Sequence, residues 1–548
     1  MDHNALDEAP HRAAPGRSAR GTARVRAGLG VAAVLAVAVP SLMPTAAQAD
    51  PASRAATTQW STETLAPGVQ VRTGTIRHTG VTHTWTITVQ SPAISRLTGA
   101  ATWSEVGTRT WADTTARNLR AADFQPRVEN VRWPDYSDTP HGTMGLRVRI
   151  GSYSTQAEAQ SAAAAITAAG FRTSVAWTGY DIQQPADREN VHVAVIDPRV
   201  FRGSVEGTHD GDVAQRRTTS SVAARLRSLV AVNGGFFVTS NADGVQGTMS
   251  GLGAYDGELG SMAVGSRAAL ILGDGGRHIR VADLTTTVTA RAGHSSYRIQ
   301  GINRVPGLVR DCGRPGASPS DLPWQDVTCR LTDDLVRFTP EFGADLPTGP
   351  GVQAVLDASG RVVSVGARGG RVPVGGSVLQ GIGGAADWLT ANAEAGSRVR
   401  VGEVVRDTSG RRVELDGDDS VVSAAPTLVR NGRVDIDAAA EGVVDPQDLS
   451  FGYAWANTRQ PRTMAGVDRK GRLILATVDG RRTGGSEGFT LQEAAEFMRS
   501  LGAVQALNLD GGGSAAMAVR GTLVNNPSDA TGERAVGDTV QVLPADAG

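Results

Sequence analysis

The chain has 548 residues and a formal net charge of -1, with 40% hydrophobic and 20% charged residues. This length predicts two or three domains, because single hydrophobic cores stop growing beyond about 250–300 residues. The near-neutral charge excludes a global basic field of the kind that holds nucleic acid, and it also excludes a strong acidic excess.

The first fifty residues have the pattern of an export signal. A stretch with five arginines is followed by an apolar run over Ala27–Val39, and an A-x-A cleavage site ends at Ala49. The apolar run is short for a membrane span, so we interpret residues 1–49 as a signal peptide and Asp50 as the mature N-terminus. We therefore expect a secreted or extracellular protein without a transmembrane anchor after cleavage, with cell-wall association as one option.

The chain has two cysteines, Cys312 and Cys329. In an exported protein so close a pair predicts a disulfide bond, which stabilises the fold by about 3 kcal/mol in the chain-entropy model. Two cysteines cannot make a structural zinc site alone, and the nine histidines show no H-E-x-x-H spacing. The sequence identifies no metal site and no cofactor, and it leaves open whether a divalent cation takes part.

The N-terminal part of the mature chain combines a polar start with strand signals. Residues 50–60 are small and polar and predict a disordered start. Val69–Thr75 and Thr82–Val89 are rich in β-branched residues and predict strands. The segment 50–81 is therefore an N-terminal segment that is a candidate for the first strand of a domain lying further along the chain.

Residues 82–182 show strand and helix signals in the order βαββαβ, including a capping box formed by Thr155 and Glu158. The segment LRVRIGSYSTQAEAQSAAAAITAAGFRTSV, which begins at Leu146, resembles the second half of a SPOR domain. That family binds bacterial peptidoglycan. The resemblance implies a small SPOR-like domain over 82–182 with peptidoglycan as a candidate partner, and an unrelated βαββαβ unit is the alternative.

From Asn190 onward, turn signals between apolar runs recur and long helices are few. The hairpins that these signals predict lie at 357–360, 430–433, 468–471 and 520–521. Residues 190–543 are therefore predicted to form one large α+β domain built on mixed sheets.

The stretch 462–534 carries the strongest functional signal. Leu473–Asp479 and Ala503–Asp510 are predicted strands, and Thr490 begins the helix between them through a capping box. Strand alternation predicts that Asn508 and Asp510 project from one face, and the triple glycine that follows lets a ligand approach the backbone and its N–H groups. This combination suits a charged carbohydrate, and a glycine-rich turn with a local Asp cap is the alternative.

The motif NLDGGGSAAMAV, beginning at Asn508, resembles the signature of the phosphodiester glycosidase family. RTMAGVDRKGRLILATVDGRR and VAVNGGFF agree with that family in matching order. LAPGVQVRTGTI at 65–76 resembles its opening strand, which would make the SPOR-like unit an insertion. The resemblance implies a hydrolase that cleaves the sugar–phosphate bond of sugar-1-phosphodiesters, with cell-wall or extracellular polysaccharide as a candidate source of substrate.

The family resemblance also implies site residues. Asp510 is the expected carboxylate near the anomeric carbon, and Glu487 or Asp479 is the expected second carboxylate. Arg462 is the expected phosphate contact. The other implied substrate-binding residues are Asn233, Gly234, Gly235, Phe236, Thr463, Thr490, Asn508, Gly511, Gly512, Gly513 and Ser514. The alternatives are an ordinary turn for Asp479 and helix capping alone for Thr490.

A function from a different class is a non-catalytic protein that binds peptidoglycan or exopolysaccharide and keeps the fold without turnover. The presence of Arg462, Asn508 and Asp510 together favours the enzyme.

Overall fold

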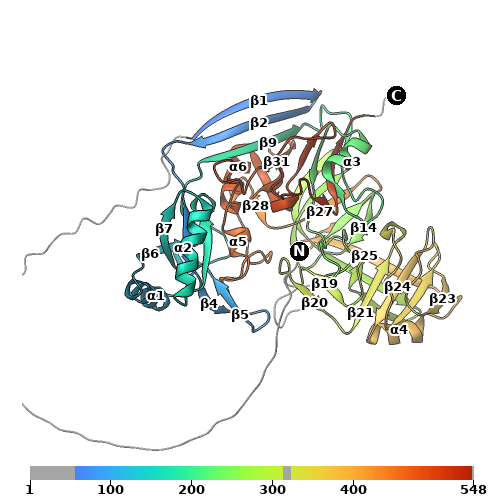
Figure 1. The fold of residues 1–548 in the computed structure, drawn as a ribbon. Coiled ribbons are helices and arrows are strands. Elements are labelled where there is room, and N and C mark those ends of the chain that lie inside the picture. Colours follow the sequence, from blue (N-terminus) through green and yellow to red (C-terminus); the bar gives the residue numbers. More distant parts are fainter. Residues whose placement is uncertain (1–55, 313–322, 546–548) are drawn as a thin grey trace, which may run out of the picture. The chain divides into compact units, whose positions relative to one another are not determined.

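The computed structural model describes residues 56–312 and 323–545 of the chain. The signal peptide predicted for residues 1–49 lies outside the described residues. Strands outnumber helices and form several sheets with antiparallel pairs and a parallel pair, which confirms the predicted α+β class (Figure 1). Among the described helices, none has the length and apolar character needed to cross a membrane.

The first large sheet has eight strands whose pairings are all antiparallel. In spatial order they are β1 (Ala56–Ala66), β2 (Val69–His78), β9 (Arg188–Ile196), β31 (Leu473–Val478), β30 (Arg462–Asp468), β32 (Ala503–Asn508), β28 (Thr427–Arg430) and β29 (Arg433–Val434). Figure 1 shows β1, β2 and β9 running side by side. The disordered start predicted for 50–60 is wrong from Ala56 onward, because β1 pairs with β2 along its length.

The neighbours β2 and β9 lie on either side of residues 82–182 in the chain. Their register runs from Val69 opposite Ile196 to Arg77 opposite Arg188. The segment 69–78 is thus a strand of the same sheet as β30, β31 and β32, the strands that carry the family motifs.

A second sheet lies beside the first and holds the VAVN segment. Its strands are β10 (Ser204–Thr208), β36 (Thr539–Leu543), β12 (Val230–Asn233), β33 (Met517–Val519) and β34 (Thr522–Leu523). Next to it are the short pair β11 (Arg217–Thr218) and β35 (Ala535–Val536) and the helix α3 (Thr219–Leu226).

Two more sheets come from the middle of the chain. One contains β14 (Glu258–Ser261), β13 (Gly253–Tyr255), β27 (Ser420–Ser423), β15 (Arg267–Gly273), β16 (His278–Ala292), β25 (Val399–Asp407) and β26 (Arg412–Val413), with β17 (Ser295–Ile299) also on β16. The other contains β18 (Gly301–Ile302), β21 (Asp334–Phe338), β24 (Ser377–Ile382), β22 (Val352–Leu356) and β23 (Val362–Gly366). Helix α4 (Gly384–Asn392) packs on β24 and β22.

One large core joins the first three sheets. Buried side chains such as Leu475, Val540 and Leu270 come from different sheets and belong to the same hydrophobic cluster. Helix α6 (Leu491–Ser500) contributes its apolar stripe to this cluster and begins at the predicted capping box of Thr490. The four predicted hairpins are confirmed as β22–β23, β28–β29, β30–β31 and β33–β34.

The predicted disulfide joins Cys312 to Cys329. Cys329 lies in β20 (Thr328–Arg330), which pairs with β19 (Leu308–Arg310), and Cys312 follows β19 by two residues. The bond therefore holds the chain near Asp311 and the chain near Asp326 in one place, and both residues take part in the site below.

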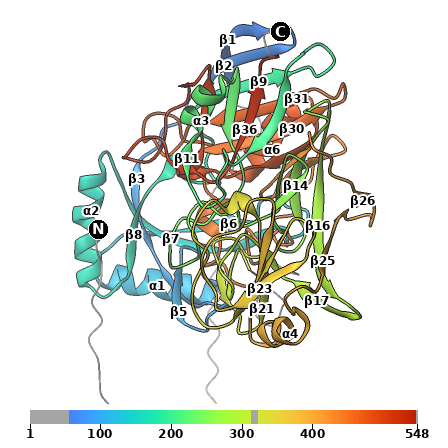
Figure 2. The same cartoon turned by 90° about the vertical axis from the view of Figure 1, so that its right-hand side faces the viewer.

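Residues 85–177 contain the predicted βαββαβ order. The elements are β3 (Trp85–Val89), α1 (Arg109–Ala121), β6 (Pro126–Arg132), β7 (Thr143–Tyr153), α2 (Gln156–Ala168) and β8 (Thr173–Trp177), with the extra pair β4 (Ser91–Ile94) and β5 (Ala101–Ser104). The sheet order is β6–β7–β3–β8, and both helices share one core with one face of this sheet (Figure 2). The relation to SPOR domains stays a prediction.

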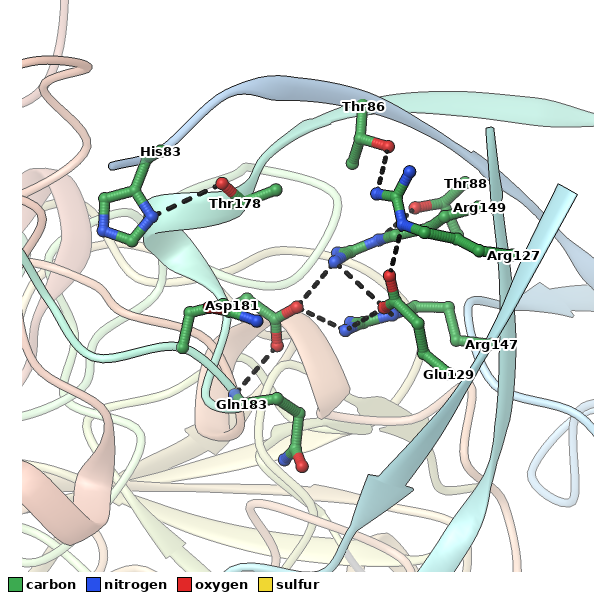
Figure 3. Close-up of polar contacts among 12 residues, drawn as sticks. His83, Thr86, Thr88, Arg127, Glu129, Arg147, Arg149, Thr178, Asp181 and Gln183 are labelled. Atoms are coloured by element: carbon green, nitrogen blue, oxygen red, sulfur yellow. Dashed lines mark hydrogen bonds and ion pairs between the residues drawn. The ribbon is translucent and has the colours of Figure 1, made fainter. Parts of the chain in front are cut away.

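The other face of the four-stranded sheet is polar and buried. Arg147 and Arg149 of β7 both bond to Asp181, which follows β8, and to Glu129 of β6 (Figure 3). The Arg149–Asp181 distance is 2.7 Å, and these three side chains are at most 4% exposed.

The cover of this face comes partly from the motif-bearing half of the chain. Asp181 forms a β-bridge with Thr458, and Arg459 Nη1 donates to the carbonyls of Gly179 and Asp181. The helix-free face is thus packed within the protein, and of the two carboxylates that both arginines share, Asp181 is the fully buried one and Glu129 is 27% exposed.

We predict that Asp181→Asn lowers the free energy of unfolding by about 3 kcal/mol, because it removes the fully buried one of the two carboxylates that Arg147 and Arg149 share. The control is Asp135→Asn, whose side chain is 84% exposed and which should change stability by less than about 0.5 kcal/mol. Urea unfolding followed by fluorescence measures both. Equal stability of the two variants would contradict the assigned role of Asp181.

Candidate active site

A polar cavity of about 240 Å³ opens beside the triple-glycine turn. Its lining comes from residues 236–250, from the pairs 310–311 and 325–326, from Trp455, and from the segment between Arg481 and Arg534. Its lining residues are Phe236, Phe237, Thr239, Ser250, Arg310, Asp311, Gln325, Asp326, Trp455, Arg481, Asp510, Gly511, Gly512, Gly513 and Arg534. Five of the fifteen predicted site residues are among them.

Asp510 lies in this cavity just beyond the end of β32. Its Oδ1 accepts a hydrogen bond from the Gly511 N–H at 2.8 Å, and Ser514 also donates to its carboxylate. Burial raises the pKa of Asp510 to about 7, against the lowering effect of these hydrogen bonds. A carboxylate with such a pKa changes its protonation near neutral pH, which suits a group that takes part in chemistry.

Three arginines surround the same space: Arg310, Arg481 and Arg534. Arg534 is held by Asp529 at 2.7 Å, and Arg310 is held by Asp326 at 2.6 Å. Arg481 donates from Nε to Gln460 at 2.6 Å. Guanidiniums held in place in this way match the oxygens of a phosphodiester in charge and geometry.

The triple-glycine turn makes room for these arginines. A Cβ on Gly512 would lie 3.1 Å from Arg481 Nη2, and a Cβ on Gly513 would collide with Arg534 and Asp529. The Gly511 N–H donates to Asp510, and the Gly512 N–H donates to the Pro461 carbonyl at 2.8 Å. These two amides are therefore already used, and guanidiniums supply the positive charge that sequence analysis expected from the backbone.

A second carboxylate in the cavity comes from a region that sequence analysis did not consider. Asp326 lines the cavity with Asp510, and its charge further raises the pKa of Asp510. Its neighbour Asp311 accepts from Ser250 and from Arg267, both at 2.9 Å. The disulfide was the available signal, because it predicted that chain near 312 and 329 is held in one place.

Asn233, Gly234 and Thr463 lie behind the cavity wall. The buried Asn233 amide donates to the Asp510 carbonyl at 2.8 Å and accepts from Thr463 Oγ1 at 2.6 Å. The Gly234 carbonyl accepts from the Asp510 N–H at 3.0 Å. Gly235 beside them donates its N–H to the buried Asp538. These predicted residues orient Asp510 and the turn before Phe236.

Arg462 is also behind the wall, although sequence analysis assigned it to the phosphate. Its side chain is fully buried and donates to the carbonyls of Phe489 and Trp455. Its guanidinium lies 4.5 Å from the Trp455 ring centroid, and Trp455 contacts Phe236 edge-on at 5.9 Å between centroids. Arg462 therefore supports two aromatic residues of the cavity.

Asp479 and Asn508 are both fully buried and outside the cavity lining. Asp479 accepts from the backbone and the side chain of Asn526, at 2.9 and 2.7 Å. Asn508 donates to the Ala425 carbonyl at 2.8 Å. Asn508 and Asp510 do not share one face of a strand as predicted, because β32 ends at Asn508.

Glu487 and Thr490 belong to the loop before α6. Glu487 accepts from Trp177 Nε1 at 3.2 Å and from the Asp187 N–H at 2.9 Å. Thr490 caps α6. Neither residue lines the cavity. Within residues 56–312 and 323–545, no group of three His, Cys, Asp or Glu side chains could hold a metal ion.

Comparison with known proteins identifies the family. The sequence model described as phosphodiester glycosidase matches residues 351–543. A solved structure from Burkholderia pseudomallei, described as an exported protein, is 32% identical with a TM-score of 0.76, and the alignment covers 89% of this chain and 97% of that chain. The chain belongs to the phosphodiester glycosidase family. The predicted resemblance to this family is thereby confirmed, whereas the SPOR-like unit stays a prediction.

Other phosphodiester glycosidase relatives match a shorter part. Bovine and human N-acetylglucosamine-1-phosphodiester alpha-N-acetylglucosaminidase are each 38% identical over 128 residues, which is 23% of this chain and 23% of each relative. The chain thus spans less than a quarter of the length of these curated relatives. A hypothetical protein from Synechocystis shares the fold, with 16% identity, a TM-score of 0.50 and coverage of 88% of this chain and 80% of that chain.

Proposed function

We propose that this protein hydrolyses the bond between the anomeric carbon of a sugar and a phosphodiester. The observation that carries the proposal is one cavity in which Asp510, with a pKa of about 7, lies among three arginines. The names of the animal relatives make α-N-acetylglucosamine-1-phosphodiesters the first substrates to test.

In this mechanism the phosphate leaves as the C1–O bond breaks, so no strongly basic leaving group needs a proton. Asp510 serves the electron-poor anomeric carbon as a nucleophile or by activating water. Arg481 and Arg534 bind the phosphate and stabilise the charge that develops on it. Addition of water gives a free sugar and a phosphomonoester.

The second carboxylate in this proposal is Asp326 and not Glu487 or Asp479. Asp326 shares the cavity with Asp510, whereas the other two carboxylates are engaged in buried hydrogen bonds elsewhere. Asn233, Thr463 and Arg462 act by positioning cavity residues.

The alternative of a non-catalytic peptidoglycan or exopolysaccharide binder has less support. A glycan chain would need an exposed face of the four-stranded sheet. On its helix-free face, Arg147, Arg149 and Asp181 are buried and bond to one another. Peptidoglycan affinity of residues 82–182 stays a prediction.

Asp510→Asn should keep the fold, because the amide is nearly isosteric, and should lower kcat by at least about 100-fold. The wild-type kcat/KM should rise with pH up to about 7 and then level off, since the ionised Asp510 is the active form. Asn508→Ala should reduce kcat less. Release of sugar from the methyl phosphodiester of N-acetylglucosamine, followed by mass spectrometry, gives these rates, and a folded Asp510→Asn variant with near-normal kcat refutes the assignment.

Arg481→Gln should lower kcat/KM for the same substrate by about 10- to 100-fold, because a charge-assisted hydrogen bond to phosphate is lost. The matched control is Arg482→Gln. That neighbouring arginine is also exposed, donates to the Pro527 carbonyl and does not line the cavity. Comparable losses in the two variants would remove Arg481 from the phosphate site.

We also propose that the protein is exported and that its mature form begins at Asp50. The signal-like N-terminus, the Cys312–Cys329 disulfide and the exported relative from Burkholderia pseudomallei support this. N-terminal sequencing of protein from the culture medium tests it, and a secreted form that retains Met1 contradicts it.

A further inference from the structure

A second cavity, of about 130 Å³, adjoins the one that holds Asp510. Ser250 and Arg310 line both cavities. The apolar residues that line the second cavity include Val238, Met249, Met262, Ile302, Leu308 and Val309.

Three chain segments continue from one cavity to the other. Residues 236–239 place Phe237 in the first cavity and Val238 in the second. The segments 248–250 and 308–311 also contribute to both cavities, and each contains one residue, Ser250 or Arg310, that lines both. The two cavities therefore adjoin each other along a wall that includes Ser250 and Arg310.

That wall is held by hydrogen bonds. Ser250 Oγ donates to Asp311 at 2.9 Å. Arg310 donates from Nη2 to Asp326 at 2.6 Å and from Nη1 to Thr328 Oγ1 at 3.1 Å. The Arg310 guanidinium is thus held in place where the two cavities adjoin. The phosphate of a substrate that occupied both cavities would lie near it.

Arg304 and Asp333, two charged residues that line the second cavity, have partners within the protein. Arg304 forms two hydrogen bonds to Asp334, at 2.6 and 2.9 Å. Asp333 accepts from Tyr297 and from the Ala385 N–H, each at 2.8 Å. An apolar lining with satisfied charges at its edge favours a neutral, apolar occupant over a second anion.

We propose that the second cavity binds the alcohol portion of the phosphodiester, and that this aglycone is an apolar alkyl or aryl group. The proposal rests on the proposed function, since it assigns the sugar and the phosphate to the first cavity. Each methylene that enters the second cavity should improve binding by about fourfold.

The test uses methyl, butyl and hexyl phosphodiesters of N-acetylglucosamine 1-phosphate, with a mannosyl phosphodiester as the hydroxylated comparison. We expect KM to fall by about fourfold per methylene until the cavity is full, and the mannosyl ester to gain less than the butyl ester. Equal KM values along the alkyl series, or a preference for the mannosyl ester, would overturn the proposal.

Val264→Phe, at the lining of the second cavity, should abolish most of the hexyl-to-methyl ratio of kcat/KM. The ratio cancels any general loss of activity. The matched control Val374→Phe changes a fully exposed valine and should keep the ratio. If both variants keep the wild-type ratio, the cavity does not bind the aglycone.

Calorimetric binding of the same esters to the Asp510→Asn protein compares their affinities without turnover. A gradient of affinity without hydrolysis by the wild-type protein would refute the proposed function and retain the aglycone cavity. Hydrolysis of the methyl ester by the wild-type protein without a gradient of affinity would support the proposed function and refute the aglycone cavity.

Discussion

The arrangement of the site depends on the buried side-chain amide of Asn233, which joins two sheets. Asn233 ends β12 of the second sheet and bonds to Thr463 of the first sheet. It also accepts from the Ala516 N–H and donates to the Asp510 carbonyl, at 3.0 and 2.8 Å. Because Thr463 and Ala516 are buried, loss of the amide would leave polar groups of both residues unsatisfied at once. The position of Asp510 is therefore determined by the junction of the sheets.

The elements that the sequence predicts correctly are those that neighbouring residues in the chain determine. Helix α6, its capping box at Thr490, the strands around it and the hairpins all depend on local periodicity and turn residues. β1 was missed because its small polar residues resemble a disordered start, although threonines at an edge strand are also compatible with pairing. The unit at 82–182 was predicted in its order of elements, but the burial of its polar face required the contact of Asp181 with distant chain.

The candidate site was harder to predict because its members come from distant segments. Asp510, Phe236 and the three glycines were found through motifs, whereas Arg310 and Asp326 lie in no recognised motif. Motif membership also put Arg462, Asp479 and Glu487 into the pocket, and each of them is buried beside it with partners of its own. A motif thus selects both the residues that face a ligand and those that hold them, and the two kinds differ only in the direction of their side chains.

The same distinction explains how Glu487 contributes without lining the cavity. Its carboxylate accepts from Trp177 and from the Asp187 N–H, so it ties the end of the βαββαβ unit to the loop 480–488. The Glu487 carbonyl accepts from the Arg481 N–H within this loop. Arg481 has a positive φ of 56°, a backbone conformation that its loop must maintain. The unit at 82–182 therefore helps to fix an arginine of the candidate site, which gives the insertion a role in the geometry of the cavity that is independent of any glycan it binds.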